Sequence, residues 1–163
     1  MDQVVAHGDP VEDVDVGPMR NSLGFLLRMA QLRTYEEYFT EYKGIGLKPG
    51  EFSVLIVIMH NPDIRQGVLA RRLMIKRAHM TKLIRSLERR GYVERRIPDE
   101  DRRSVMLRLT AEGRNFMRRK WALFLRYEEA RQSPLSAQEE RQLLRLLQAF
   151  VGIDPDGGQP ISA

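Results

Sequence analysis

Apolar residues recur at helical spacing near the start of the chain, from about Met19 to Tyr42, and include Leu23, Leu26 and Leu27. Residues three and four apart share one face of a helix, so this spacing predicts one long amphipathic helix. The sequence KGIG at residues 43–46 ends it, because glycine is the usual residue just after a helix.

A second apolar segment, FSVLIVIMH, follows Pro49 and stops at Asn61 and Pro62. Its apolar residues lie on nearly every side, which is typical of a buried helix. Proline suits the first turn of a helix, and Glu51 suits the positive end of the helix dipole. The run VLIVI would also suit a strand by propensity, but the proline start favours a helix.

Shorter elements follow between residues 65 and 110. The pattern predicts a helix at about 65–73 and another at about 76–90, which Gly91 closes. Residues 92–96 and 105–109 read as two strands, and the polar sequence between them reads as a hairpin tip. The order of these elements is that of a helix-turn-helix followed by a β-hairpin, so the chain is expected to be mainly helical with a small β-wing.

Two further helices are predicted after the hairpin. Thr110 caps a long helix that runs to about Ala130. Ser136 and Glu139 have the spacing of a capping box, and they open a last helix whose apolar residues continue to Val151. Residues 1–18 are acidic and those after Gly152 are rich in glycine, proline and aspartate, so both ends are interpreted as flexible.

Composition narrows the class of protein. The chain has 163 residues, of which 42% are hydrophobic, enough for a real core. No apolar run is long enough to cross a membrane, and the acidic N-terminus lacks the features of a secretory signal. There is no cysteine, which excludes disulfides, thiolate metal sites and thiol-based redox sensing. We therefore expect a cytoplasmic protein with no membrane partner.

Positive charge is concentrated in one segment. Between Arg65 and Lys120, Lys and Arg outnumber Asp and Glu by 18 to 6, whereas the whole chain carries only +5. The helix predicted at 76–90 places Met80 and Leu87 on one face and basic residues on the other. Such a helix beside a basic hairpin indicates a reader of double-stranded DNA, although one basic face alone would also suit an ordinary solvated surface.

The hairpin tip carries Asp101 two residues before Arg103. An aspartate can hold a guanidinium in an extended position, and so present it to the narrow minor groove where negative potential is focused. A surface ion pair of little consequence is the alternative interpretation.

Residues 69–113 resemble the winged helix-turn-helix of the MarR family of bacterial regulators. The resemblance rests on the L-A-x-x-L opening, the sequence SLERRG at 86–91, the V-E-R-R strand, the D-R-R tip and the L-T-x-x-G that opens the next helix. The order of elements extends it to about residues 20–151. There are two departures: Met74 stands where the family often has a turn glycine, and Lys76 where Ser or Asp often caps the recognition helix.

The resemblance implies a homodimer and a domain organisation. An acidic arm at 1–18 would precede an interleaved helical dimerisation module at 19–46 and 111–152, a winged helix-turn-helix DNA-binding domain at 47–110, and a tail at 153–163. The residues expected to contact DNA lie on the recognition helix and the wing: Lys76, Arg77, His79, Thr81, Lys82, Arg85, Asp101, Arg102 and Arg103. No cofactor is expected.

Members of this family commonly release DNA when a small organic molecule binds between the dimerisation module and the DNA-binding domains. The run LLRMAQ at 26–31 is similar to the branch that senses hydroxycinnamoyl-CoA thioesters or related aromatic acids, which suggests control of aromatic-compound catabolism. An arginine beside apolar residues suits a carboxylate or a coenzyme A phosphate. The effector-binding candidates are Phe25, Arg28, Met29, Gln31, Leu32 and His60. An ordinary dimer helix with exposed arginines is the alternative.

Other functional classes find little support in the sequence. It lacks the G-x-S-x-G, Walker and H-E-x-x-H motifs and has no cysteine nucleophile, so we expect no enzyme. The three histidines lack ligand spacing, and no metal site is expected. A ligand-independent architectural DNA-binding protein remains the alternative to a regulator with an effector.

Overall fold

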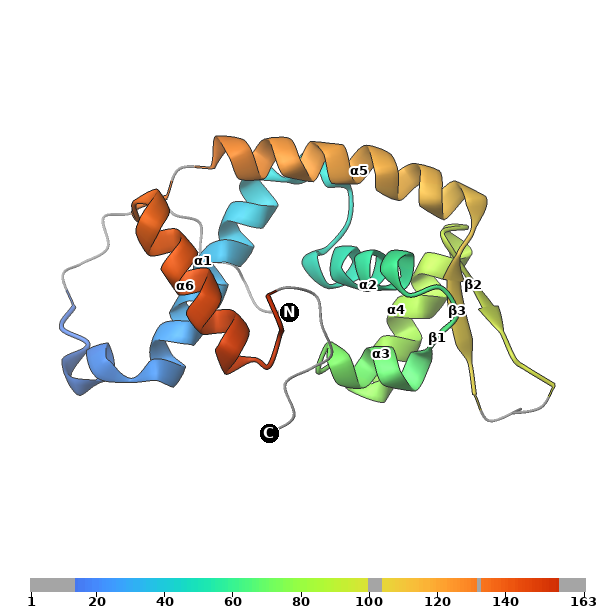
Figure 1. The fold of residues 1–163 in the computed structure, drawn as a ribbon, viewed down its shortest axis with the longest axis horizontal. Helices are drawn as coiled ribbons and strands as arrows, with labels where there is room; N and C mark the ends of the chain where they lie inside the picture. The colour runs from blue at the N-terminus through green and yellow to red at the C-terminus, as the bar shows by residue number, and fades with distance from the viewer. Residues whose placement is uncertain (1–13, 100–103, 132, 156–163) are drawn as a thin grey trace. The chain divides into compact units, whose positions relative to one another are not determined.

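The computed structural model describes residues 14–99, 104–131 and 133–155, and these residues form a mainly helical protein with one small sheet (Figure 1). The chain divides into two compact units at Glu128. The first unit holds α1 to the greater part of α5, and the second holds α6. This confirms the expected fold class, a winged helix-turn-helix with additional helices.

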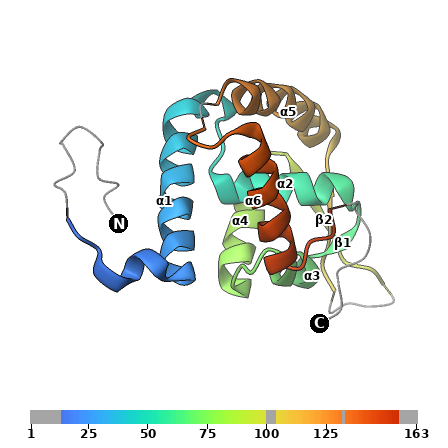
Figure 2. The ribbon, with the colours of Figure 1, turned by 60° about the vertical axis from the view of Figure 1, so that its left-hand side comes forward.

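The first helix, α1, spans Leu23–Glu41 and follows a short 3-10 turn, η1, at Gly17–Asn21. The expected start near Met19 is therefore too early, because Ser22 caps the helix by accepting the backbone N–H of Phe25 at 3.4 Å. A second 3-10 turn, η2, at Lys43–Ile45 leads from α1 to α2 (Figure 2). Gly46 ends it with φ of 69°, a conformation that favours glycine.

Three helices form the head of the first unit. They are α2 at Pro49–His60, α3 at Gln66–Arg72 and α4 at Arg77–Arg89. The run VLIVI lies within α2, so the strand alternative is wrong: its apolar side chains are buried on several sides of a helix, as the proline start predicts. The other two helices begin and end close to their predicted positions.

The sheet has three antiparallel strands in the order β1-β3-β2. Strands β2 (Val93–Arg96) and β3 (Met106–Leu109) form the predicted hairpin. No sequence pattern indicates β1 (Ile64–Arg65), in which Ile64 pairs with Leu107. A two-residue strand is too short to show an alternating pattern.

The core of the first unit lies where α2, α4 and the sheet meet. Leu55, Ile84 and Leu107, one from each, are inaccessible to solvent. Aromatic side chains extend this core to α1 and α5. The ring centroid of Tyr42 lies 5.6 Å from that of Phe124 and 4.9 Å from that of Tyr127. The last turn of α1 is thus fixed to the head.

The long helix α5 spans Ala111–Ala130. Thr110 caps it as predicted, because its Oγ1 accepts the backbone N–H of Gly113 at 2.9 Å. Gly113 lies against the backbone of Tyr92, and a Cβ at this position would be 2.1 Å from the carbonyl oxygen of Tyr92. Any amino acid with a side chain at position 113 would prevent α5 and the start of β2 from approaching so closely.

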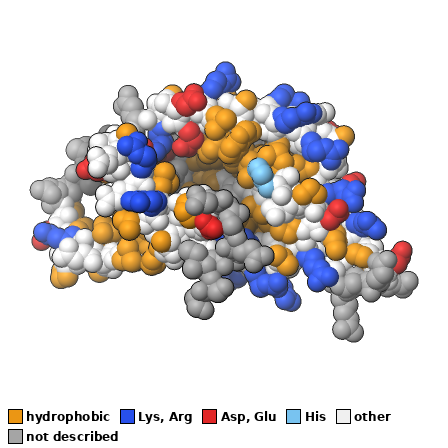
Figure 3. Space-filling view, in the orientation of Figure 1, with side chains coloured by type: hydrophobic (Ala, Val, Ile, Leu, Met, Phe, Trp, Pro, Cys, Tyr) orange, Lys and Arg blue, Asp and Glu red, His pale blue; other side chains and the backbone are white. Residues whose placement is uncertain are grey.

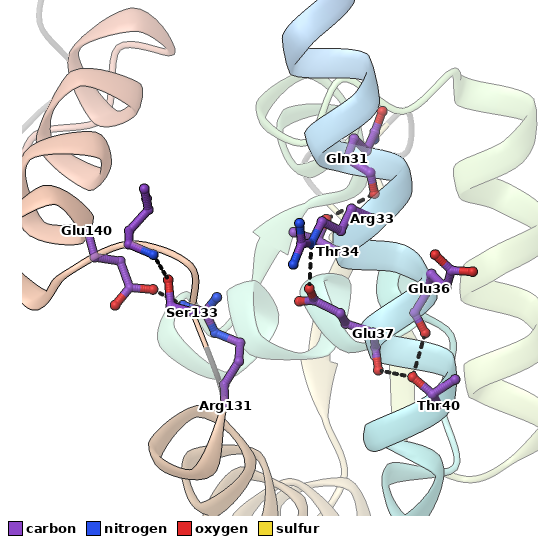
Figure 4. Close-up of polar contacts among 10 residues, drawn as sticks. Gln31, Arg33, Thr34, Glu36, Glu37, Thr40, Arg131, Ser133 and Glu140 are labelled. Atoms are coloured by element: carbon purple, nitrogen blue, oxygen red, sulfur yellow. Dashed lines mark hydrogen bonds and ion pairs between the residues drawn. The ribbon is translucent and has the colours of Figure 1, made fainter. Parts of the chain in front are cut away.

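The second unit contains α6, Ala137–Phe150, which opens with the predicted capping box. The Ser136 hydroxyl accepts the Glu139 N–H, and the Glu139 carboxylate accepts the Ser136 N–H at 2.8 Å. These hydrogen bonds to Ser136 lower the pKa of Glu139. Arg131 pairs with Glu140 beside this cap (Figure 4). Within the described ranges, no helix is long and apolar enough to span a membrane.

Candidate nucleic-acid interface

Helix α4 separates an apolar face from a basic one. Met80, Ile84 and Leu87 have no solvent-accessible surface and pack into the head. The other face leaves six residues exposed to solvent: Arg77, Ala78, His79, Lys82, Arg85 and Arg89. This division is the one that the sequence predicts, and it leaves hydrogen-bond donors free on the side of the helix that would meet a duplex.

Thr81 differs from its expected place on the exposed face. It is half-buried, and its Oγ1 donates to the carbonyl oxygen of Arg77 at 3.0 Å while accepting Nε2 of Gln66 at 3.2 Å. The hydroxyl proton of Thr81 is therefore engaged in a hydrogen bond within the head and is not available to DNA. Thr81 therefore joins α4 to the first residue of α3, a role that the sequence did not reveal.

The turn between α3 and α4 contains Met74, whose φ is 51° and whose side chain is 85% exposed. The left-handed conformation explains why a glycine would suit this position, since a residue with a Cβ is strained there. The turn is held by two backbone bonds, from Met74 N–H to Arg71 and from Ile75 N–H to Ala70. The turn thus keeps its left-handed conformation although Met74 replaces the glycine that is common at this position in the family.

Lys76 lies at the N-cap of α4 and is exposed, with no side-chain capping bond. A lysine at this position opposes the helix dipole and leaves the first N–H groups of α4 without a side-chain acceptor. A phosphate group would supply the missing acceptor and neutralise the ammonium group.

The base of the wing is held by ion pairs. Arg95 on β2 contacts Glu88 on α4 at 2.6 Å, and Arg108 on β3 contacts Asp63 at 2.9 Å. Asp63 precedes β1 and has φ of 61°. Sequence reasoning missed the Asp63–Arg108 pair because the two residues are 45 positions apart. The wing tip, including Asp101, Arg102 and Arg103, lies outside the described residues.

Basic side chains lie over one face of this head. The space-filling view shows Lys and Arg over α5, around the base of the wing and at the α3–α4 end of the first unit (Figure 3). A positive surface of this kind attracts polyanions over a distance of about 10 Å at moderate salt.

The residues predicted to bind an effector do not form one cluster within the described chain. Phe25 is half-buried on α1, whereas the other four candidates on that helix, Arg28, Met29, Gln31 and Leu32, are exposed. His60 lies at the end of α2, where its Nδ1 is 2.9 Å from the carbonyl oxygen of Ile56. Gln31 accepts the Thr34 hydroxyl through its backbone oxygen, a contact within α1 (Figure 4).

A cavity of about 520 Å³ opens elsewhere in the first unit. It lies between the end of α1, η2, the first turn of α2 and the last turns of α4, and Lys43, Lys48 and Arg90 contribute its positive charges. None of the predicted effector-binding residues lines it. Among the residues that the structure describes, no three His, Asp or Glu side chains gather as metal ligands would.

Comparison with known proteins agrees with this architecture. A sequence model of the MarR family matches residues 45–104. A transcriptional regulatory protein for the hcr operon of Thauera aromatica is 30% identical, over 86% of this chain and 85% of that protein. The transcriptional repressor YetL of Bacillus subtilis is 31% identical over 68% of this chain and 66% of its own length. The solved structure of the repressor CouR bound to a 23-mer DNA duplex is 31% identical, with a TM-score of 0.75 over 86% of this chain and 99% of that one.

Proposed function

This chain belongs to the MarR family of transcriptional regulators, and from that membership and the geometry of α4 we propose that it represses transcription as a DNA-binding homodimer released by a small organic effector. The relatives are regulators and not enzymes, which confirms the prediction that this chain is no enzyme.

The observation that carries the DNA-binding proposal is the exposed basic face of α4. Lys82 and Arg85 lie on the solvent side of a helix whose opposite side is buried, so the helix is packed into the head while these two side chains face solvent. A helix of this kind fits the major groove, where Arg and Lys recognise guanine edges. The structure of CouR, which is bound to a DNA duplex, supports the binding of DNA by this chain.

The homodimer proposal rests on apolar surface that one chain leaves exposed. Leu26 and Leu32 on α1 are each 48% exposed, and Leu146 and Phe150 on α6 are each 61% exposed. Monomeric proteins rarely leave such stripes uncovered. We propose that the helices at 19–46 and 111–152 bury them against a second copy. A two-fold dimer would bind a pseudo-palindrome with half-sites about one helical turn apart.

For the effector, we propose an aromatic acid or its coenzyme A thioester, which would link this regulator to aromatic-compound catabolism. Arg28 provides a positive charge on the same helix as Phe25 and Met29, and these residues share α1 with the stripe assigned to the dimer. An effector bound there would touch the helix that sets the spacing of the two heads. A ligand-independent architectural protein is the competing proposal.

The experiment is selection of genomic DNA. Fragments that the purified protein retains would be sequenced, and the binding of one enriched fragment and of a shuffled copy would be measured by fluorescence anisotropy at two salt concentrations. We expect enrichment of a pseudo-palindrome and tighter binding of it than of the shuffled duplex. Retention of fragments with no shared sequence would refute the regulator and favour the architectural protein.

A further inference from the structure

We infer that Met74, in the turn between α3 and α4, contacts the C5-methyl group of a thymine in each half-site of the bound duplex, and so helps to set which DNA sequence this chain prefers. The inference rests on the proposed function and deepens it, because it adds an uncharged residue outside α4 to the surface that reads DNA. Thymine is the one base that presents a methyl group in the major groove, and apolar side chains are the ones that contact it.

Met74 has the most exposed large apolar side chain in the described part of the chain, at 85%. Its two neighbours do the opposite, since Leu73 and Ile75 pack against the core of the head. The turn thus directs one apolar side chain outward between two that are held inside. An apolar side chain that stays in water gains nothing from burial, so the exposure of Met74 does not stabilise a single chain.

The backbone conformation of Met74 does not serve the fold either. Its φ of 51° lies in the left-handed region, where a side chain is strained and glycine is favoured. The turn holds it there, because the N–H of Met74 donates to Arg71 at 3.0 Å and that of Ile75 donates to Ala70 at 2.9 Å. Strained residues that the surrounding structure fixes are typical of functional sites. A methionine that is both strained and exposed therefore points to a contact outside the chain.

The charges around Met74 identify the partner. Four exposed basic residues lie within three positions of it along the chain: Arg71, Arg72, Lys76 and Arg77. The same surface of a second copy would bring equal positive charge and be repelled, whereas a polyanion is attracted. Met74 also lies two residues before Lys76, the N-cap of α4. Since the N-terminal residues of a recognition helix are the ones that meet base edges, Met74 extends the exposed face of α4.

Two apolar parts of a duplex are open to this side chain, the thymine methyl group and the deoxyribose ring. The methyl group projects into the major groove, which is the groove that α4 is proposed to enter, whereas deoxyribose belongs to the backbone. Methionine is long, unbranched and flexible, so it adapts its shape to a small apolar target. The position of Met74 beside the start of α4 therefore favours the methyl group.

The test replaces each thymine of the selected operator, one at a time, with deoxyuridine, which removes only the C5-methyl group. Fluorescence anisotropy on the full chain should show binding that is weaker by about twofold to fourfold at one position of each half-site. Met74→Gly should weaken binding of the unmodified operator by the same factor and should be insensitive to that thymine. Because both changes remove one contact, the combined loss should be no larger than either alone. Met74→Leu keeps an apolar side chain and should retain the sensitivity.

A second pair of measurements separates this role from a structural one. Met74→Gly relieves the left-handed strain and removes no buried side chain, so its urea midpoint should be higher than that of the parent. A variant that is more stable and yet binds the operator more weakly has not lost affinity through damage to the fold. The dependence of operator affinity on salt should stay the same, because no charge is removed.

Three outcomes would overturn the inference. If no thymine replacement weakens binding, or if Met74→Gly keeps the sensitivity of the parent, Met74 does not contact a thymine methyl group, and the proposed function still stands. Equal weakening of operator and random duplex by Met74→Gly would assign the side chain to deoxyribose, which carries no sequence information. A parent protein that prefers no duplex over any other would refute the proposed function and this inference with it.

Discussion

Gln66 donates from Nε2 to Oγ1 of Thr81 at 3.2 Å, and this bond joins the first residue of α3 to the second turn of α4. Thr81 in turn donates to the carbonyl oxygen of Arg77 at 3.0 Å. The contact links α3 to α4. It is a positioning contact for α4, the helix proposed to read DNA.

Breaking this bond should loosen α4 and lower its discrimination between DNA sequences. Thr81→Val removes the hydroxyl and keeps the shape, so we expect the free energy of unfolding to fall by about 1 kcal/mol. Gln66→Met should have an effect of similar size. Urea denaturation of both single variants and of the double variant would measure the coupling, because the double loss should be smaller than the sum. Strictly additive losses would show that the bond contributes nothing.

Lys82 and Arg85 are expected to read base edges. Replacing either with alanine should reduce the preference for operator over random duplex by about 1–3 kcal/mol if the side chain makes a bidentate base contact. A residue that contacts only phosphate would instead weaken both duplexes equally and make the salt dependence shallower. Anisotropy on both duplexes at several salt concentrations separates these outcomes. Arg119→Ala on α5 is the control for the loss of one charge.

Much of the fold could be predicted from the sequence because its signals are local. The Ser136–Glu139 box and the Thr110 cap each involve residues three apart, and both form as predicted. The buried face of α4 follows from helical spacing alone. The start of α1 was misplaced because apolar spacing continues through η1, and only the side chain of Ser22 marks the real boundary.

The rest depends on contacts between distant parts of the chain. Strand β1 exists because Ile64 pairs with Leu107, and the sequence around Ile64 does not indicate this partner. The Gln66–Thr81 bond and the cavity beside Arg90 likewise need the helices to be placed in space first. The sequence indicates the basic residues of α4, but it does not show that the Thr81 hydroxyl is hydrogen-bonded to Gln66 and Arg77.

Gly113 should tolerate no side chain. A Cβ would lie 2.1 Å from the carbonyl oxygen of Tyr92, which also accepts the N–H of Thr110 at 3.1 Å. We expect Gly113→Ala to lower the free energy of unfolding by about 3 kcal/mol or more, since the backbone itself must move. Gly50→Ala in the first turn of α2 is the control, because nothing lies within 4 Å of its Cβ. It should stabilise the helix slightly, and a similar loss in both variants would contradict this explanation.

The wing tip offers a test that separates charge from geometry. Arg103→Ala should weaken operator binding, since the predicted guanidinium contact with the minor groove is lost. Asp101→Ala should weaken it as well if Asp101 holds Arg103 in place, although removal of a negative charge alone would strengthen binding to DNA. An anisotropy titration shows whether Asp101→Ala weakens or strengthens operator binding, and so decides between a positioning role and a purely electrostatic role of Asp101. Tighter binding by Asp101→Ala would show that this aspartate does not position the arginine.

The proposed dimer should separate when a charge enters its apolar surface. Leu143 lies on the apolar side of α6 and is 44% exposed in one chain. Leu143→Glu would place a carboxylate in the interface, where burial of an unpaired charge is strongly unfavourable. We expect sedimentation at micromolar concentration to show a dimer for the parent and a species near the chain mass of 19.0 kDa for the variant.

Gln138→Glu is the matched control, because it adds the same charge on the polar side of α6, where the residue is exposed. It should remain a dimer. Operator affinity should fall for Leu143→Glu and not for Gln138→Glu, since separate chains bind two half-sites without the advantage of being linked. If the parent itself sediments as a single chain and still binds the full pseudo-palindrome as tightly, the two-fold dimer is not the form that reads DNA.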